Sequence, residues 1–250
     1  MPTQRLDALD VLRGLALLWM SVYHFCYDLN QFGHLRLDFY HDAFWTWQRS
    51  AIVGLFLFCS GLGQASAVGT GQSWRRFWRR WMQLACCALL VSAGSYAVAP
   101  QSFIYFGVLH GIALMLIVAR CSAQAGNGLW PLGAMAIAVP FMAADWIAGS
   151  GYAALFNAPA LNWLGLISEK PVTDDYVPLL PWLGMMVWGL AAGSWLLRRR
   201  PRWLQWSAPR PMQPLALIGR WSLTYYMLHQ PLMIGALTLY SIFALARSSS

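Results

Sequence analysis

Residues 8–28 read ALDVLRGLALLWMSVYHFCYD, and this stretch decides the fold. It is a predominantly apolar run of about the 20 residues that a helix needs to cross a bilayer. It shows no alternation of apolar and polar residues, which a membrane β-strand would require. Because backbone groups in hydrocarbon must be paired internally, the stretch predicts a transmembrane α-helix.

The composition of the whole chain indicates the same class of protein. Of its 250 residues, 58% are hydrophobic and only 10% are charged, whereas soluble domains are about one quarter charged. Further apolar blocks follow at residues 45–68, 81–98, 102–120, 129–148, 177–197 and 215–244. We therefore predict an all-α fold, a polytopic integral membrane helical bundle of about seven to eight transmembrane helices. Residues 1–247 are predicted to form a single domain and residues 248–250 a disordered tail.

Two prolines bear on the number and shape of the spans. Residues 152–167 are apolar but short and are interrupted by Pro159. They are therefore an interfacial helix, a re-entrant segment or an eighth span. Pro231, within the last apolar block, is expected to kink or tilt that helix.

Arginines mark the connections that face the cytoplasm. Arg75, Arg76, Arg79 and Arg80 follow the second predicted span, Arg120 follows the fourth, and the sixth is followed by Arg198, Arg199, Arg200, Arg202 and Arg210. Positively charged connections stay on the cytoplasmic side, so the N-terminus is predicted to be cytoplasmic. The net charge of +8 therefore reports topology, and no nucleic-acid partner is predicted. The five cysteines form no spaced ligand motif, so no metal site is predicted.

Ionisable residues inside an apolar span are costly and are functional candidates by default. The first span carries Asp10 and Arg13, three residues apart, and then His24 and Asp28, four residues apart. Each pair shares a helix face. Arg13 is a candidate for binding an anion, and Asp28 for orienting His24 as a general base roughly 16 Å further along the axis. The alternatives are a charge network at the helix start and a His–Asp pair that locks neighbouring helices together.

Four more polar residues lie within or at the ends of other predicted spans. His110 and His229 are near the middle of the fourth and seventh spans. Each is either a functional residue or a hydrogen-bonding residue between packed helices. Arg220 lies near the cytoplasmic end of the seventh span. Arg49, near the outer end of the second, either pairs with Asp28 or Asp42 or forms a surface pair.

Several motifs together resemble a known group of membrane enzymes. Residues 5–16, RLDALDVLRGLA, with Tyr23-His24-Phe25 after them, resemble the first helix of transmembrane acyltransferases. Arg13 and His24 are also similar to the arginine–histidine pair of the acyltransferase type 3 family. Nearly the whole chain resembles bacterial relatives of the heparan-α-glucosaminide N-acetyltransferase catalytic domain. The other motifs that carry this resemblance are residues 58–61, 107–110, 177–184 and 217–231.

The resemblance implies an acyltransferase of the bacterial inner (cytoplasmic) membrane. It would move an acetyl group from cytoplasmic acetyl-CoA to a hydroxyl or amine of a sugar or cell-envelope glycan, with membrane lipids and a second copy of the chain as further partners. The implied catalytic residues are His24, Asp28, His41, His110 and His229. The implied donor-binding residues are Asp10, Arg13, Arg49, Arg220, Ser222 and Tyr226.

The resemblance leaves the choice of base open between His24 and His41. The lysosomal members of the group place their proposed catalytic histidine in the loop before the second span, and His41 is the nearest match to it. These 250 residues are also fewer than in those members, and no stretch among them resembles their large luminal domain. The identity of the acceptor therefore does not carry over.

Two other functions use the same residues. One is a transporter of an anionic or sugar-like solute, although no internal repeat of the kind common in transporters is visible. The other is a haem-binding electron carrier with His110 and His229 as ligands.

Overall fold

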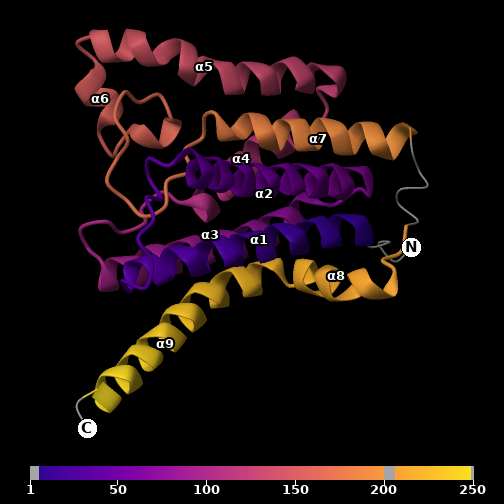
Figure 1. Ribbon diagram of the computed structural model, residues 1–250. Helices are drawn as coiled ribbons and strands as arrows, with labels where there is room; N and C mark the ends of the chain where they lie inside the picture. The colour runs from indigo at the N-terminus through magenta and orange to yellow at the C-terminus, as the bar shows by residue number, and fades with distance from the viewer. Residues whose placement is uncertain (1–5, 200–205, 249–250) are drawn as a thin grey trace. The chain divides into compact units, whose positions relative to one another are not determined.

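The computed structural model of the protein describes residues 6–199 and 206–248. Within these ranges the regular structure is helical, and the only β-type pairing is an isolated bridge between Phe106 and Tyr176 (Figure 1). The predicted all-α, polytopic membrane fold is confirmed. Arg5, Arg200, Arg202 and residues 249–250, which entered the predictions above, lie outside the described residues.

The described chain divides into two compact units. The central unit runs from residue 54 to residue 199, and the terminal unit combines residues 6–53 with residues 206–248. Helix α2 (Ala43–Gly69) begins in the terminal unit and continues into the central one. The terminal unit therefore joins the first and last helices of the chain.

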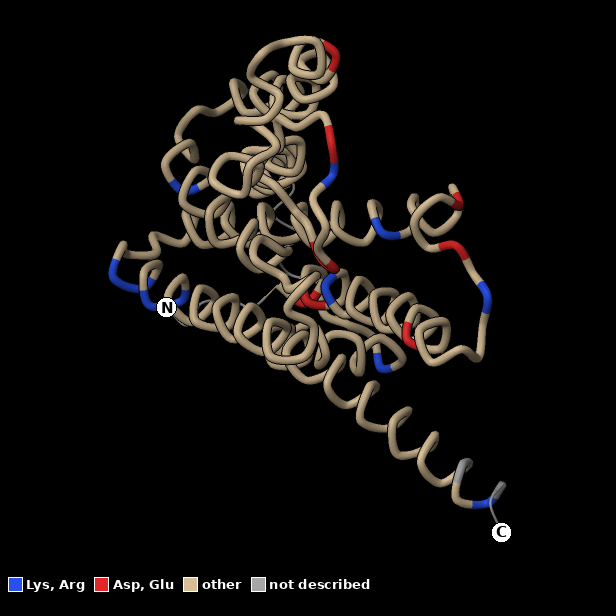
Figure 2. Tube along the Cα trace, turned by 90° about the vertical axis from the view of Figure 1, so that its left-hand side faces the viewer, with Lys and Arg blue, Asp and Glu red and all other residues tan. Residues whose placement is uncertain are grey.

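Five helical segments are long and apolar enough to cross a membrane. They are α1 (Asp7–Gln31), α2, α3 (Trp74–Val98), residues Gly126–Gly149 and residues Ser222–Ala244. Figure 2 shows how few charged residues interrupt these helices. Two other predicted spans form shorter helices, the 15-residue α4 (Val108–Ser122) and the 18-residue α7 (Trp182–Arg199), which ends in two arginines. Residues 152–167 form only the five-residue α6 (Ala153–Asn157) and the 3-10 turn η2 (Asn162–Leu164).

Close helix packing builds the central unit. A Cβ atom on Gly61 of α2 would collide with the backbone of Met186 in α7, and one on Gly189 would collide with the backbone of Phe58. Small residues of this kind let membrane helices approach closely. In α5 (Leu129–Gly149), the carbonyl of Trp130 accepts a hydrogen bond of 3.1 Å from Trp188 Nε1, which ties α5 to α7.

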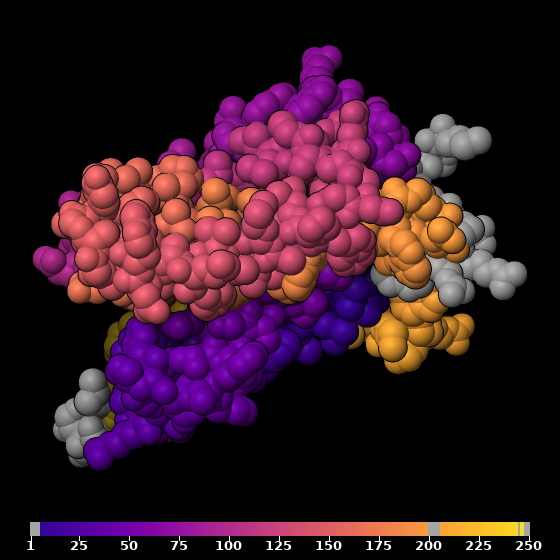
Figure 3. All heavy atoms as spheres, turned by 90° about the horizontal axis from the view of Figure 1, so that it is seen from above, coloured from indigo at the N-terminus to yellow at the C-terminus, as the bar shows by residue number. Residues whose placement is uncertain are grey.

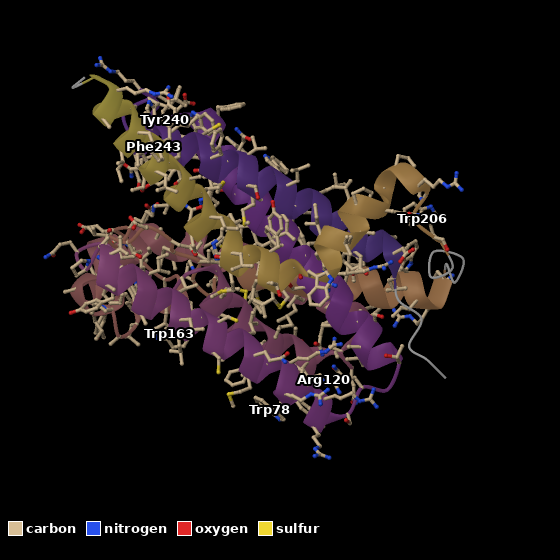
Figure 4. All side chains as sticks on the ribbon, turned by 90° about the horizontal axis from the view of Figure 1, so that it is seen from below. Trp78, Arg120, Trp163, Trp206, Tyr240 and Phe243 are labelled. Carbon is tan, nitrogen blue, oxygen red and sulfur yellow. The ribbon has the colours of Figure 1, made fainter. Side chains whose placement is uncertain are left out.

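Helix α3 begins seven residues earlier than its apolar block predicts. Arg75, Arg76, Arg79 and Arg80 therefore lie in its first turns and not in a connection. Ser73 caps the helix by accepting a hydrogen bond from Arg76 N. Arg120, near the end of α4, lies 5.0 Å from the ring centroid of Trp74, and Figure 4 labels it at the same end as Trp78. Arginine and tryptophan side chains together are typical of a membrane boundary.

Helix α4 begins at Val108, six residues later than predicted. Asp175 lies far away in sequence, and its Oδ2 accepts a hydrogen bond of 2.7 Å from Val108 N. The carboxylate therefore satisfies one of the free amides at the start of the helix. Burial raises the pKa of the neighbouring Tyr176, whose hydroxyl donates to the carbonyl of Asn162.

Large apolar side chains remain exposed on the helices. Leu89 and Leu90 of α3 and Phe141 and Met142 of α5 are more than half exposed. Helix α5 presents a broad surface in Figure 3. Exposed apolar side chains in such number would be a liability in water and suit contact with lipid.

The last predicted span is broken into two helices within the terminal unit. Helix α8 (Gln213–Arg220) ends just before Trp221. Helix α9 (Ser222–Ser248) begins directly after Trp221 and bends along its length (Figure 1). A Cβ atom on Gly14 would meet the backbone of Leu215, and one on Gly219 would meet the backbone of Asp10. The two glycines therefore allow α1 and α8 to pack backbone against backbone.

Candidate active site

The polar residues of α1 and α9 lie side by side in the terminal unit. Ser21 pairs with Tyr225 at 2.8 Å, His24 contacts His229, and Asp28 pairs with Gln230. Residue numbers rise together along both helices, so α1 and α9 run in the same direction.

Two histidine rings form the centre of this cluster. The rings of His24 and His229 lie 5.3 Å apart between centroids, at an interplanar angle of 64°. The ring of Tyr225 stacks on that of His229 with a centroid distance of 6.2 Å and an angle of 6°. The hydroxyl of Tyr225 shares a hydrogen bond with Ser21.

The hydrogen bond of His229 assigns its tautomer. Its Nδ1 lies 2.7 Å from the carbonyl oxygen of Tyr226. A carbonyl oxygen can only accept, so Nδ1 carries the proton and Nε2 carries the lone pair. Nε2 is buried and finds no hydrogen-bond partner among the described residues. The arrangement gives His229 the form of a proton acceptor.

Asp28 does not pair with His24 as the four-residue spacing predicts. Its side chain is buried, and its Oδ1 accepts a hydrogen bond of 2.7 Å from Gln230 Nε2. Oδ2 of the same carboxylate is buried and unpartnered within the described chain. Spacing places two residues on one helix face, but a residue from another helix can take the contact.

Charged residues gather at the other end of α1. Arg220 Nη2 lies 3.0 Å from Asp7 Oδ1, and Arg220 Nε lies 3.6 Å from Asp10 Oδ2. Arg13 Nη1 lies 3.6 Å from the other oxygen of Asp10. The side chains of Arg13 and Arg220 keep 29% and 35% of their surface exposed. Two guanidinium groups are therefore held in place by two carboxylates while part of each still faces outward.

Three other predicted site residues of the terminal unit belong neither to the histidine cluster nor to this charged group. His41 is in the loop before α2, 87% exposed, and its Nδ1 pairs with Asp38 at 3.0 Å. The backbone amides of His41 and Tyr40 hold the pKa of Asp38 below its ordinary value. Arg49 forms neither of its predicted ion pairs within the described chain. Asp42 accepts from Phe44 N at the start of α2, and Asp28 pairs with Gln230. Ser222 is the first residue of α9.

His110 belongs to the central unit, where both of its ring nitrogens have hydrogen bonds. Gly107 N donates to Nδ1 at 3.3 Å, and Nε2 lies 3.2 Å from Ser92 Oγ, which in turn donates to the carbonyl of Ile104. The histidine thus links α3 to α4 in the way that polar residues join packed helices. These bonds leave no free nitrogen for haem iron.

Sequence reasoning named both histidines of the cluster but gave no role to Gln230. Gln230 could have been named from the sequence, because an uncharged polar residue within a span usually forms a hydrogen bond to a neighbouring helix. Which helix it would meet was not visible in the sequence.

The comparisons with known proteins agree with this membrane fold. The model of the family described as "heparan-alpha-glucosaminide N-acetyltransferase, catalytic" matches residues 5–231, which include α1, both histidines and Gln230. No curated protein and no solved structure matches the chain. Since the match covers most of the chain, the protein belongs to the heparan-alpha-glucosaminide N-acetyltransferase catalytic family, a family of membrane acetyltransferases.

Proposed function

We propose that the protein transfers an acetyl group from cytoplasmic acetyl-CoA to a hydroxyl or amine of a sugar or cell-envelope glycan. The observation that carries this proposal is the pair of His24 and His229, with a buried Nε2 lone pair on His229. Acyl transfer needs a group that takes a proton from the attacking oxygen or nitrogen. The family match supports the acetyl chemistry.

The histidine pair accounts for the proton in this reaction. As the acceptor oxygen or nitrogen attacks the thioester carbonyl carbon, its proton passes to a ring nitrogen of the pair. The carbon–sulfur bond then breaks, and the thiolate of CoA takes that proton. The sequence prediction assigns the base to His24, whereas the hydrogen bond at Nδ1 favours Nε2 of His229. Ser21 Oγ donates to the carbonyl of Leu17 and therefore accepts from the hydroxyl of Tyr225, so Tyr225 could donate to the developing oxyanion only by leaving Ser21.

Arg13 and Arg220 are suited to the phosphates of the donor. Guanidinium groups bind phosphate oxygens in pairs, and both side chains are partly exposed at the end of α1 that is predicted to be cytoplasmic. From Arg13 to His24 the helix rises roughly 16 Å. The extended arm of CoA would cover this distance and bring the thioester to the histidines.

The test is acetyl transfer by the purified protein in lipid nanodiscs, with acetyl-CoA and either glucosamine or glucose as acceptor. Free CoA thiol and acetylated product are both measured. We expect His229→Ala and His24→Ala each to lose about 10²–10⁴-fold in rate if the residue is the base, and less if it only supports the base. Gln31→Ala, which replaces an exposed polar residue at the end of α1, is the control.

Full activity in both variants would remove the histidine pair from the mechanism. Absence of acetyl transfer in the native protein, together with solute flux into liposomes, would favour a transporter.

A further inference from the structure

Four exposed arginines in the first two turns of α3 find no partner for their charge among the described residues. No ion pair or side-chain hydrogen bond joins their guanidinium groups to the rest of the described chain. The carboxylates of the central unit, at positions 145, 169, 174 and 175, lie near the end of α5 and in the loop after it. We call these four residues the arginine cluster: Arg75, Arg76, Arg79 and Arg80.

The position of the arginine cluster is costly for the helix. Free backbone amides make the start of a helix partly positive, so cations there oppose its dipole. The cluster also contains two pairs of like charges four residues apart, a spacing that destabilises a helix. The side chain of Ser73 nevertheless starts the helix before them by accepting from Arg76 N. An anion bound at the cluster would remove both costs.

The arginine cluster points away from α4, the helix against which α3 packs. Phe77 and Ala88 are the buried residues of α3, and Trp81 Nε1 donates a hydrogen bond of 2.8 Å to the carbonyl of Ala113 in α4. At about 100° per residue, the four arginines lie on the other side of the helix from these contacts. They therefore project outward from the central unit.

The same side of α3 is apolar further along the helix. Cys86 and Leu90 lie within about 60° of Arg75 around the helix axis. Cys86 is exposed, and Leu90 keeps 62% of its surface exposed. One outward face thus begins with positive charge and continues as a surface that suits hydrocarbon.

Tryptophans place the arginine cluster at the membrane boundary. Trp74 and Trp78 alternate with the arginines along the chain and are 49% and 43% exposed, and Figure 4 labels Trp78. Amphipathic rings of this kind prefer the level of the lipid headgroups. The phosphates of the bilayer lie at the same level and are therefore the anions nearest to the cluster.

We propose that the outward face of α3 is a binding site for an anionic phospholipid. The arginine cluster holds the phosphate, because guanidinium groups bind phosphate oxygens in pairs. An acyl chain of the same lipid lies along Cys86 and Leu90. A zwitterionic lipid carries its own ammonium and leaves no net charge, whereas an anionic lipid compensates the cluster. The site is in the central unit and does not depend on the proposed acetyl transfer.

Competition between two lipids tests the proposal. Native protein in detergent is equilibrated with equal amounts of phosphatidylglycerol and phosphatidylcholine that have the same acyl chains. Free lipid is removed, and the bound lipids are measured by mass spectrometry. We expect phosphatidylglycerol to be enriched at least about 10-fold, since each arginine near a membrane surface favours anionic lipid. The enrichment should fall at high salt, which needs no variant to observe.

Two double variants with the same change of charge locate the site. Arg75→Gln with Arg79→Gln should lower the enrichment by at least about fivefold. Arg198→Gln with Arg199→Gln, at the end of α7, should lower it less than about twofold. The first variant also removes a pair of like charges, so it should melt no lower than the native protein in phosphatidylcholine alone. That melting temperature shows that its loss of lipid is not a loss of fold.

Four outcomes would overturn the site. They are equal retention of the two lipids by the native protein, enrichment that persists unchanged at high salt, native enrichment in Arg75→Gln with Arg79→Gln, and an equal loss in the α7 variant. Free CoA is added in a separate arm. If CoA abolishes the enrichment in the native protein, the arginine cluster binds a soluble phosphate and the assignment to lipid is wrong. Enrichment that survives CoA supports it.

Discussion

His24 and His229 meet face to edge, with their ring centroids 5.3 Å apart, although one lies in the first long helix and the other in the last. The hydrogen bond from His229 Nδ1 to the carbonyl of Tyr226 distinguishes the two rings, because it fixes where the lone pair of His229 lies. The packing of α1 against α9 therefore brings together the two histidines of the proposed reaction. Along α1, Arg13 lies on one side of this histidine pair and Asp28 lies on the other.

Replacement of Arg13 tests whether this residue binds the acetyl-CoA donor. We expect Arg13→Ala to raise the KM for acetyl-CoA by about 10-fold, since one charge-assisted contact with phosphate is lost. Arg13→Lys should recover only part of it, because an ammonium lacks the paired donors of a guanidinium. Steady-state kinetics with varied acetyl-CoA measure the effect. Arg36→Ala, an exposed arginine of the next loop, is the control, and an unchanged KM in Arg13→Ala would contradict donor binding there.

Substitution of Gly219 tests the close packing of α1 and α8. In Gly219→Ala the new Cβ atom would meet the backbone carbonyl of Asp10, and backbone cannot move aside cheaply. We expect a loss of about 1–3 kcal/mol in the free energy of unfolding. Gly235→Ala in α9 is the matched control, because nothing lies within 4 Å of its Cβ position. Equal stability of the two variants in denaturant titrations would show that the helices do not approach as described.

The membrane helices were predictable where hydropathy alone determines them. The block at residues 8–28 became α1, Asp7–Gln31, which begins one residue earlier and ends three residues later than predicted. Hydropathy shows which residues suit the hydrocarbon of a bilayer, and it does not show where a helix begins or ends. It therefore missed the arginine-rich start of α3 and the break at Trp221. The start of α4 depends on Asp175, a residue from a distant loop, and no local pattern contains that information.

The site was predictable as a set of residues but not as a set of contacts. Polar residues within apolar runs stand out, and His24, Asp28 and His229 were named on that basis. Their partners depend on which helices pack together. Asp28 therefore bonds to Gln230 from α9 and not to His24 on its own helix.

Removal of the Asp175 side chain tests the start of α4. The carboxylate accepts from Val108 N, so Asp175→Ala should cost about 0.5–2 kcal/mol of stability, the range for loss of a helix cap. Asp174→Ala, the neighbouring aspartate, should cost less. Thermal unfolding in detergent compares the two. If Asp174→Ala proves the more damaging, the cap is not what holds this turn.

Replacement of His41 tests whether the catalytic base lies in the loop before α2. Its side chain is 87% exposed and pairs with Asp38, so the geometry does not favour it as a buried proton acceptor. We expect His41→Ala to keep its rate within about threefold, well short of the 10²-fold loss that marks a general base. The nanodisc assay with acetyl-CoA and glucosamine measures it. A loss as large as that of His229→Ala would place the base in the loop before α2.

Asp38, in the same loop, should make the stability of the folded protein depend on pH in acid. Hydrogen bonds from the backbone amides of His41 and Tyr40 hold the pKa of Asp38 below its ordinary value of 3.8 in the folded protein. A carboxyl whose pKa is lower when folded binds more protons when unfolded. Its stabilising effect is therefore complete above pH 3.8 and is lost as the pH falls through the folded-state pKa. Asp38→Asn should flatten the fall in melting temperature below about pH 4, whereas Glu169→Gln should not. A melting curve of Asp38→Asn that falls with acid as steeply as the native protein's would show that the loop does not hold this carboxylate.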